Sequence, residues 1–434
     1  MDILNSLLPT IEHFQTAGYW MAFLFALSET IVGIGLFIPG LTAILIMGAM
    51  AAGGGFDIGG LIFFAIFGAV LGDNINYYIG LWILPGYFFA QSLNTAKLWL
   101  SRTDFFFFFI LLLLMLFYIL KYTIIKYGQK FLIIMKSLWR SVKQAIIENR
   151  KIKAYQAKHP KLLAFLKKRL DKTTFYGRSF TLLAIAFGYA LSLFGGVIEN
   201  FINTDVITAI DIRVSRLLLL FRDAELIKVF LGITILGKWQ VALMAVVAAI
   251  SILWLIKKKN YILPFIITIA GSVFFNYFSK LFFHRPRPEI AVYIEKSYSF
   301  PSGHATIAVA LYGFLAYILL REAKTWKKKV NVFFAGLLLI FLIGFSRIYL
   351  GVHYVSDILS GYLLGALWLI IGISIAEYIF SNKKTAQTQV IARKNKIAAI
   401  SIFLASLFLY IFFAVSCHPP LSAPPNAQAN QILK

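Results

Sequence analysis

The sequence predicts an all-α, polytopic helical membrane protein. Of its 434 residues, 60% are hydrophobic and only 14% are charged, and the mean hydropathy is +0.80. The apolar residues gather in runs of about 20, the length that an α-helix needs to cross the hydrocarbon core of a bilayer. We therefore expect an integral membrane protein with many crossings.

The apolar runs predict the order of the helices. An interrupted run over 20–52 contains Pro39 and Gly40 and suggests a re-entrant hairpin at the start of the chain. Continuous runs, each a predicted helix, lie near 60–80, 105–126, 179–200, 238–256, 261–281, 303–320, 330–347, 356–379 and 397–416. The six runs from 179–200 to 356–379 are predicted to form one helical bundle, and 397–416 is one extra helix after it.

The net charge of +24 is concentrated between the apolar runs. Basic residues cluster at 257–259, 321–329 and 383–396 and over the longer stretch 127–178. This is the positive-inside pattern, which places these segments in the cytoplasm. A basic groove for nucleic acid would need a soluble module, and none is evident. The loops 282–302 and 348–355 are then expected on the opposite, non-cytoplasmic face.

Three other segments have compositions that suggest their role. Residues 127–178 alternate apolar and basic residues, which is typical either of amphipathic helices on anionic headgroups or of a solvated basic linker. Residues 199–237 carry mixed charges and predict a helix along the membrane interface, as a roof over the non-cytoplasmic end of the bundle.

The C-terminal residues 418–434 resemble a disordered external tail. The single cysteine, Cys417, excludes an intramolecular disulfide and a cysteine-based metal site.

The first of three charged motifs lies where a predicted helix leaves the membrane. Lys280 and Arg287 are seven positions apart, and Pro286 and Pro288 stop the helix there. A guanidinium binds two phosphate oxygens in parallel, and an ammonium acts as a point charge. Arg285 is a further candidate cation. Basic residues also anchor helices at the membrane interface, but such anchors prefer the cytoplasmic face, so a phosphate site is the better interpretation.

The second motif, Pro301-Ser302-Gly303-His304, opens the next predicted helix. Ser302 is a candidate N-cap, and Gly303 allows close approach of a ligand to the backbone. Free N–H groups at a helix N-terminus favour anions, so the backbone of Ser302 and Gly303 is expected to hold phosphoryl oxygens. His304 would then lie beside the phosphate as a general acid.

The third motif begins at Ser346-Arg347 and continues with His353 and Asp357. His353 and Asp357 are four residues apart and share one helical face. A hydrogen bond from one ring nitrogen to Asp357 would fix the tautomer and leave the other nitrogen free to attack. Arg347 would hold the phosphoryl oxygens. All three motifs are predicted to meet on the non-cytoplasmic face.

Together the three motifs, K-x6-RP, PSGH and SR-x5-H-x3-D, resemble the signature of the type 2 phosphatidic acid phosphatase superfamily. The resemblance is complete at every signature position and covers roughly residues 178–380. It implies that His353 is a nucleophile that forms a phosphohistidine, that Asp357 orients it, and that His304 gives a proton to the leaving oxygen. It further implies that the phosphoryl group is held by Lys280, Arg287, Arg347 and the backbone of Ser302 and Gly303. No metal and no other cofactor is implied.

The N-terminal region resembles the first half of DedA-family membrane proteins. The residues that carry this resemblance are Glu29, Phe37-Ile38-Pro39-Gly40, Gly72-Asp73 and Tyr77-Tyr78-Ile79-Gly80, followed by Leu84-Pro85-Gly86-Tyr87-Phe88-Phe89. The arginine-bearing central section of that family is missing between Gly80 and Leu84. Glu29 and Asp73 are the candidate transport residues, and a set of ordinary apolar helices is the alternative interpretation.

These observations predict four regions. They are a DedA-like membrane region over 1–126, a basic cytoplasmic linker over 127–177, a lipid phosphatase domain over 178–380, and a C-terminal transmembrane helix with an external tail over 381–434. The leading hypothesis is a phosphatase in the inner membrane of a bacterium, acting at the periplasmic or external face on a lipid phosphomonoester or terminal pyrophosphate. Undecaprenyl pyrophosphate, phosphatidate, phosphatidylglycerophosphate and lipid A phosphates are all compatible substrates. The alternative is transport of a lipid or polyprenyl phosphate by the DedA-like part, and the intact motifs argue against a purely non-catalytic anchor.

Overall fold

The computed structural model consists of helices joined by turns and loops. It describes residues 19–20, 22–24, 26–27, 58–83, 102–148, 157–171, 174–203, 205–382 and 393–416. No strand occurs in these parts of the chain, and the all-α prediction is confirmed. The chain divides into two compact units, Met1–Trp99 and Leu100–Lys434.

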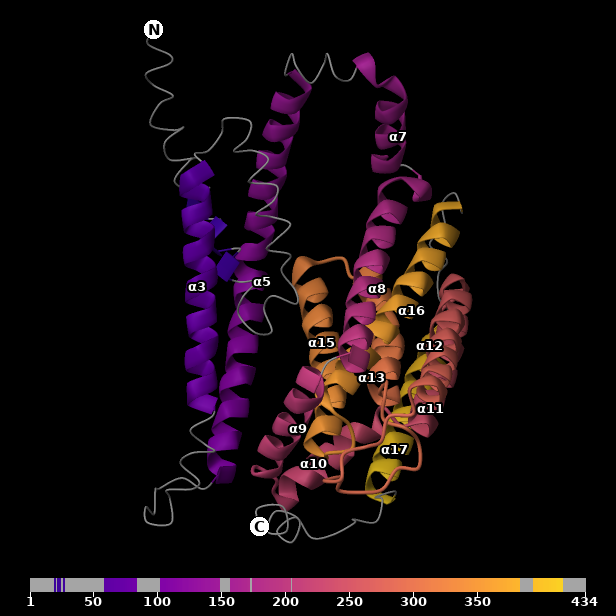
Figure 1. Ribbon diagram of the computed structural model, residues 1–434. Helices are drawn as coiled ribbons and strands as arrows, with labels where there is room; N and C mark the ends of the chain where they lie inside the picture. The colour runs from indigo at the N-terminus through magenta and orange to yellow at the C-terminus, as the bar shows by residue number, and fades with distance from the viewer. Residues whose placement is uncertain are drawn as a thin grey trace. The chain divides into compact units, whose positions relative to one another are not determined.

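The first unit is described mainly by helix α3 (Ile58–Ile83; Figure 1). This helix contains the predicted run at 60–80, and Asp73 within it is exposed. Glu29, the Phe37–Gly40 segment and the Leu84–Phe89 segment lie outside the described residues. A transport role for this region stays a prediction.

The second unit begins with α5 (Arg102–Glu148), a single helix of 47 residues. The sequence predicted a helix that ends near 126, but α5 continues because no proline interrupts it and its residues are mostly good helix formers. Trp326 packs against Gly128 and donates a hydrogen bond of 3.0 Å from Nε1 to the carbonyl of Ile124, which ties the middle of α5 to the bundle. After α5 comes α7 (Pro160–Leu170). Residues 127–148 and 160–170 are therefore helical, and their contact with lipid headgroups stays a prediction.

The bundle follows the predicted runs to within a few residues. Its elements are η1 (Phe175–Ser179), α8 (Phe180–Asn203), α11 (Trp239–Leu255), η2 (Lys259–Tyr261), α12 (Ile262–Phe283), α13 (Gly303–Ile307), η3 (Ala308–Gly313), α14 (Phe314–Glu322), α15 (Trp326–Tyr349) and α16 (Val355–Asn382). Helices α13 and α14 and the π-helical turn η3 between them form one crossing, Gly303–Glu322. Within the described residues, six helices are long and apolar enough to cross a membrane.

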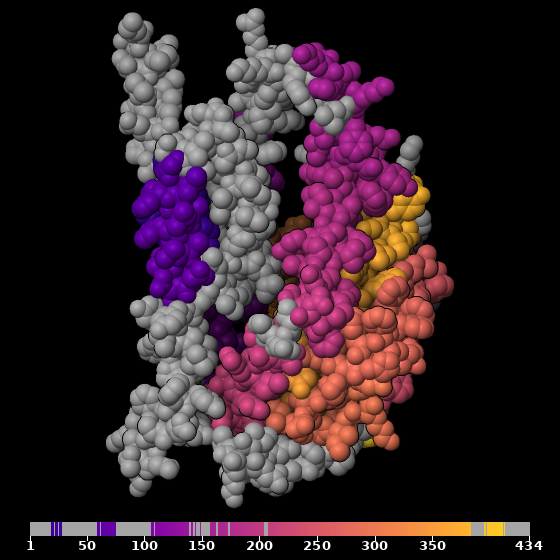
Figure 2. Space-filling view, in the orientation of Figure 1, coloured from indigo at the N-terminus to yellow at the C-terminus, as the bar shows by residue number. Residues whose placement is uncertain are grey.

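Helix α16 packs against α8, α12 and α13. The space-filling view shows α8 lying along α16 at the surface (Figure 2). Gly361 and Gly365 allow the close approach to α13, since a Cβ atom at either position would lie 2.6 Å from a backbone oxygen of Ser302 or Thr306. The start of α13 is thereby fixed against the first turns of α16.

Two helices, rather than the one interfacial helix predicted, occupy most of 199–237. They are α9 (Asp205–Leu219) and α10 (Ala224–Ile235). Helix α10 meets α11 at a bend of 45°, and the length and composition of the pair fit one broken span or a re-entrant loop. The apolar run predicted at 238–256 is α11, and a second apolar helix, α10, precedes it.

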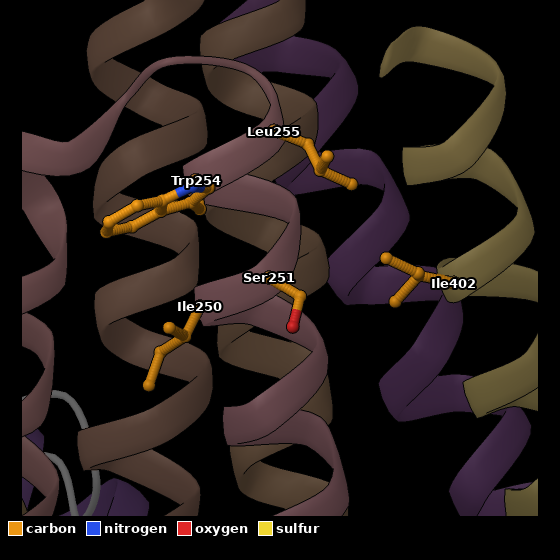
Figure 3. A pocket seen from close by; sticks show the side chains of 5 residues that line it. All are labelled: Ile250, Ser251, Trp254, Leu255 and Ile402. Carbon is orange, nitrogen blue, oxygen red and sulfur yellow. The ribbon is translucent and has the colours of Figure 1, made fainter. Parts of the chain in front are cut away.

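The extra C-terminal helix is α17 (Arg393–Ser416). It packs against α11 and α10, and Tyr410 donates a hydrogen bond of 3.1 Å to the carbonyl of Gly232. A cavity of about 430 Å³ between α11 and α17 is lined by Ile250, Ser251, Trp254, Leu255 and Ile402 (Figure 3). None of the motif residues lines this cavity.

The two ends of the bundle differ in their polar contacts. At one end, next to the basic loops, Lys258 forms an ion pair of 2.8 Å with Glu322, and Arg321 pairs with Glu377. The three charged motifs lie at the other end of the same helices. The structure thus separates the motifs from the basic loops by the length of the bundle, as the sequence predicted.

Candidate active site

The three motifs meet at the end of the bundle where α12 and α15 finish and α13 and α16 begin. Lys280 is in the last turn of α12, and Arg287 follows in the loop. His304 is in the first turn of α13, and Arg347 is in the last turn of α15. His353 lies in the turn between α15 and α16, and Asp357 in the first turn of α16.

His353 is held by hydrogen bonds at both ring nitrogens. Its Nδ1 lies 3.2 Å from Oδ2 of Asp357, and its Nε2 lies 3.1 Å from Nη1 of Arg287. A carboxylate only accepts and a guanidinium only donates hydrogen bonds, so Nδ1 carries the proton and Nε2 keeps its lone pair. This is the tautomer that leaves Nε2 able to attack.

The charge of His353 follows from its surroundings. The side chain is 1% exposed. Burial, together with the positive charges of Arg287 and Arg347, holds the pKa of His353 well below its ordinary range. The imidazole is therefore neutral at neutral pH, as a nucleophile has to be.

An unpredicted carboxylate, Glu295, lies between the two arginines. Its Oε2 is 2.7 Å from Nη2 of Arg287, and its Oε1 contacts Nη2 of Arg347. Arg347 is fully buried and donates a further hydrogen bond of 2.9 Å to Oγ1 of Thr234. Arg287 also donates to the carbonyls of Ser297 and Val352, at 2.7 Å each. The two guanidiniums are thus aimed at one shared anion.

Glu295 is ionised in this position. Burial alone would raise the pKa of its carboxyl, but the charges of Arg347 and Arg287 outweigh burial and hold this pKa well below its usual range. A carboxylate and a phosphoryl group are bound by guanidinium in the same bidentate manner. Glu295 therefore marks an anion position at Nη2 of Arg287, whose Nη1 contacts His353.

The start of α13 differs from the prediction in one respect. Ser302 was expected to cap the helix and to offer its backbone N–H to phosphate, but its hydroxyl makes no capping bond. Its N–H instead donates at 2.9 Å to the carbonyl of Asp357, because α16 packs so closely here. Among the described residues, neither Oγ of Ser302 nor Nε2 of His304 has a hydrogen-bond partner, and both atoms are buried. The ammonium of Lys280 donates a hydrogen bond to the carbonyl of Tyr298. Gly303 is the first residue of α13, as predicted.

Arg285 was predicted as a further phosphate cation, and the structure contradicts this. Its guanidinium lies 2.6 Å from Oδ1 of Asp357 and 2.7 Å from Oδ2 of Asp211, and the side chain is 6% exposed. It also lies over the rings of Phe201 and Tyr354. Both of its charged partners are carboxylates of the protein, so Arg285 belongs to the support of Asp357.

Sequence reasoning did not single out Asp211 as a site residue. It is buried on the face of α9 that also carries Ser215 and Leu218. The spacing of these three positions, four and then three residues, is that of one helical face. A carboxylate on the buried face of an amphipathic helix was the signal that could have found it.

Comparisons with known proteins show what this chain is similar to. A family model described as the PAP2 superfamily matches residues 261–381. Phosphatidylglycerophosphatase B of Bacillus subtilis (strain 168) is 33% identical over 181 residues, which are 41% of this chain and 89% of that protein. Undecaprenyl-diphosphatase of Sulfolobus acidocaldarius is 32% identical over 95 residues, which are 22% of this chain and 38% of that protein.

Solved structures are also similar. One of them is the crystal structure of a transmembrane PAP2 type phosphatidylglycerolphosphate phosphatase from Bacillus subtilis, at 28% identity and a TM-score of 0.40, covering 47% of this chain and 98% of that chain. The residues matched by the family model include all three motifs and exclude Asp211.

Proposed function

This chain belongs to the PAP2 superfamily and is a membrane lipid phosphatase, and on this premise we propose that it releases phosphate through a phosphohistidine formed on His353. The observation that carries the proposal is the state of His353. Its Nδ1 is held by Asp357, and its Nε2 lies beside Arg287 and an anion position. In this state the lone pair of Nε2 accepts a hydrogen bond from Nη1 of Arg287, and the attack on phosphorus requires Arg287 to transfer this hydrogen bond to a phosphoryl oxygen.

In the first step, Nε2 of His353 attacks phosphorus. The N–P bond forms, and the bond from phosphorus to the lipid oxygen breaks. The departing oxygen takes a proton from protonated His304, whose buried Nε2 has no other partner among the described residues. Asp357 stabilises the positive charge that develops on the imidazole of His353.

In the second step, a water molecule attacks the phosphohistidine. His304, now neutral, takes a proton from the water while the new O–P bond forms and the N–P bond breaks. Inorganic phosphate leaves, His353 regains its lone pair, and His304 is protonated for the next turnover. The protein's own cations, Arg287, Arg347 and Lys280, stabilise the charge on the phosphoryl oxygens in both steps.

Entry of the phosphoryl group requires Glu295 to leave. The carboxylate contacts the same two guanidiniums that the phosphoryl oxygens need, and it carries charge of the same sign. Glu295 lies in the loop between α12 and α13 and is 24% exposed, so it has solvent to move into. The substrate therefore exchanges one anion for another at this position.

The substrate we propose is a lipid whose phosphate is presented at the non-cytoplasmic face of a bacterial inner membrane. Support comes from the separation of the site from the basic loops, which the positive-inside rule places in the cytoplasm. The names of the relatives point to phosphatidylglycerophosphate and undecaprenyl pyrophosphate as the first lipids to compare.

The test is phosphate release in detergent from a panel of lipids that also includes phosphatidate and lipid A. We expect hydrolysis of at least one of them and its loss in His353→Ala. Full activity of His353→Ala would contradict the mechanism. Hydrolysis of none of the four would contradict the substrate class.

A further inference from the structure

The buried carboxylate of Asp211 has no role in the chemistry described above. Asp211 is 1% exposed and comes from α9. It accepts a hydrogen bond of 3.0 Å from the backbone N–H of Ser356 and another from the Ser356 hydroxyl. Its remaining partner is Nη2 of Arg285, at 2.7 Å. Every one of these partners is adjacent to Asp357 or in contact with it.

Arg285 joins Asp211 to the nucleophile. Its Nη1 donates to Oδ1 of Asp357 at 2.6 Å and to Oγ of Ser356 at 2.7 Å. The other oxygen of Asp357, Oδ2, accepts from Nδ1 of His353. The hydrogen bonds therefore run without a gap from Asp211 through Arg285 and Asp357 to His353.

The two carboxylates divide the donors of one guanidinium between them. Because Nη2 is held by Asp211, only Nη1 reaches Asp357, and it reaches the oxygen that faces away from His353. Without Asp211, the guanidinium fork would be free to turn and bind both oxygens of Asp357, the geometry that arginine prefers with a carboxylate. Such a bidentate contact would compete with His353 for Oδ2.

We propose that Asp211 is a positioning residue, which holds Arg285 so that Asp357 keeps Oδ2 for Nδ1 of His353. The inference rests on the proposed function of His353 as the nucleophile. It deepens that function, because it makes α9, a helix outside the matched family segment, part of the machinery that orients the nucleophile. Asp211 itself touches neither the phosphate position nor the attacking nitrogen.

Stabilisation of the fold is a poor explanation for the buried ion pair between Asp211 and Arg285. Buried charge pairs cost desolvation energy, and well-packed apolar residues of similar volume often stabilise a protein as well or better. A purely structural role also makes a different kinetic prediction. It would lower the fraction of folded enzyme, whereas loss of positioning lowers the turnover of each folded molecule.

The experiment compares Asp211→Asn with the unchanged full-length chain, purified in detergent, on a lipid from the panel that the unchanged chain hydrolyses. The folded fraction is measured by gel filtration and thermal unfolding, and kcat is normalised to it. We expect kcat to fall about 100-fold, the loss typical of a small misplacement of a reacting group, with KM unchanged. Asp223→Asn is the matched control. Asp223 caps α10 through its side-chain oxygen, which asparagine also provides, so kcat should not change.

Two outcomes separate this inference from the proposed function. If Asp211→Asn keeps the kcat of the unchanged chain while His353→Ala is inactive, Asp211 is not a positioning residue and the proposed function stands. If His353→Ala is fully active, the proposed function fails whatever Asp211→Asn does. A parallel rise in KM would also contradict the inference, since it would show that the phosphate position itself is disturbed.

If Asp211→Asn does not fold, Ser356→Ala gives the second test. This variant keeps both carboxylates and Arg285 but removes the hydroxyl that lies between them. We expect a smaller fall in kcat, again with KM unchanged. An unaltered kcat in Ser356→Ala would contradict the proposed arrangement.

Discussion

The carboxylate of Glu295 lies 2.7 Å from the guanidinium of Arg287. It also contacts Arg347, so one glutamate pairs with both arginines that we propose to bind the phosphoryl group. The position is therefore filled by an internal anion before any substrate binds. In the proposed mechanism, phosphate therefore competes with Glu295 for these two arginines.

Replacing Glu295 by glutamine should strengthen phosphate binding. The neutral amide competes less well for the two arginines, so the fraction of enzyme with an open anion position rises. We expect the inhibition constant of inorganic phosphate to fall about tenfold, as happens when a competing closed state is removed. The measurement is competitive inhibition of lipid hydrolysis. Glu289→Gln, an exposed carboxylate of the same loop, is the control and should leave the constant unchanged. Weaker inhibition in Glu295→Gln would show instead that Glu295 is needed to orient the arginines.

The acidic limb of the pH profile should reflect the low pKa of His353. Protonation of His353 removes the lone pair that attacks, so activity is lost as the pH falls through this pKa and is present above it. Because burial and the neighbouring arginines hold the pKa of His353 well below its ordinary range, this loss should occur well below about pH 6.5. The rate of enzyme phosphorylation at saturating substrate, followed from pH 7 downwards, checks this. A half-maximal rate near the ordinary histidine value would contradict it.

Gly237, in the turn between α10 and α11, should be required for the position of His304. A Cβ atom at Gly237 would lie 2.7 Å from Cδ2 and 3.0 Å from Cβ of His304, too close for either to remain in place. We expect Gly237→Ala to lower kcat about 100-fold through displacement of the general acid. A nitrophenyl ester, whose leaving group needs no proton, should lose much less activity than a lipid substrate.

The control for that variant is Gly232→Ala. A Cβ atom at Gly232 meets open space, and the position is in the interior of α10. Its kcat should equal that of the unchanged chain. If Gly237→Ala hydrolyses the lipid with the same kcat as the unchanged chain, the placement of His304 is contradicted.

Gly361 should be required for the close approach of α16 to α13. A Cβ atom there would lie 2.6 Å from the carbonyl oxygen of Ser302 and 2.9 Å from Cβ of Ala305. Overpacking of this kind costs about 1–3 kcal/mol, so Gly361→Ala should lower the midpoint of thermal unfolding in detergent. Gly188→Ala, at a position in α8 that is open to solvent or lipid, should not lower it. A midpoint unchanged in both variants would show that the two helices can separate freely.

The sequence was sufficient for the crossings of the bundle and for the expectation that the three motifs meet at one end of it. Each crossing is a long, uninterrupted run of apolar residues with polar residues on both sides. The ends of the bundle helices were therefore predicted to within a few residues. Residues such as His353 and Asp357 were found because their spacing is local, one helical turn.

The residues that sequence reasoning missed act across long distances in the chain. Arg285 looked like a phosphate cation, since nothing in its neighbourhood shows that Asp211, 74 residues earlier, lies against it. Glu295 lies in a loop with no regular pattern. One of its partners, Arg287, is in the same loop, but the other, Arg347, is 52 residues away in the chain. The N–H of Ser302 was expected to be free, but tight packing of α16 supplies a carbonyl acceptor that only the tertiary structure reveals. Helix α5 continues beyond its predicted end near 126 because the polar residues that follow do not by themselves end a helix.

The most direct test of the account is capture of the phosphorylated enzyme. The unchanged chain is mixed with a lipid substrate labelled in its phosphate and quenched within one turnover in alkali, where phosphohistidine is stable. We predict label on His353 in the unchanged chain and neither label nor hydrolysis in His353→Ala. Hydrolysis without labelled enzyme, or label that persists in His353→Ala, would contradict the central claim.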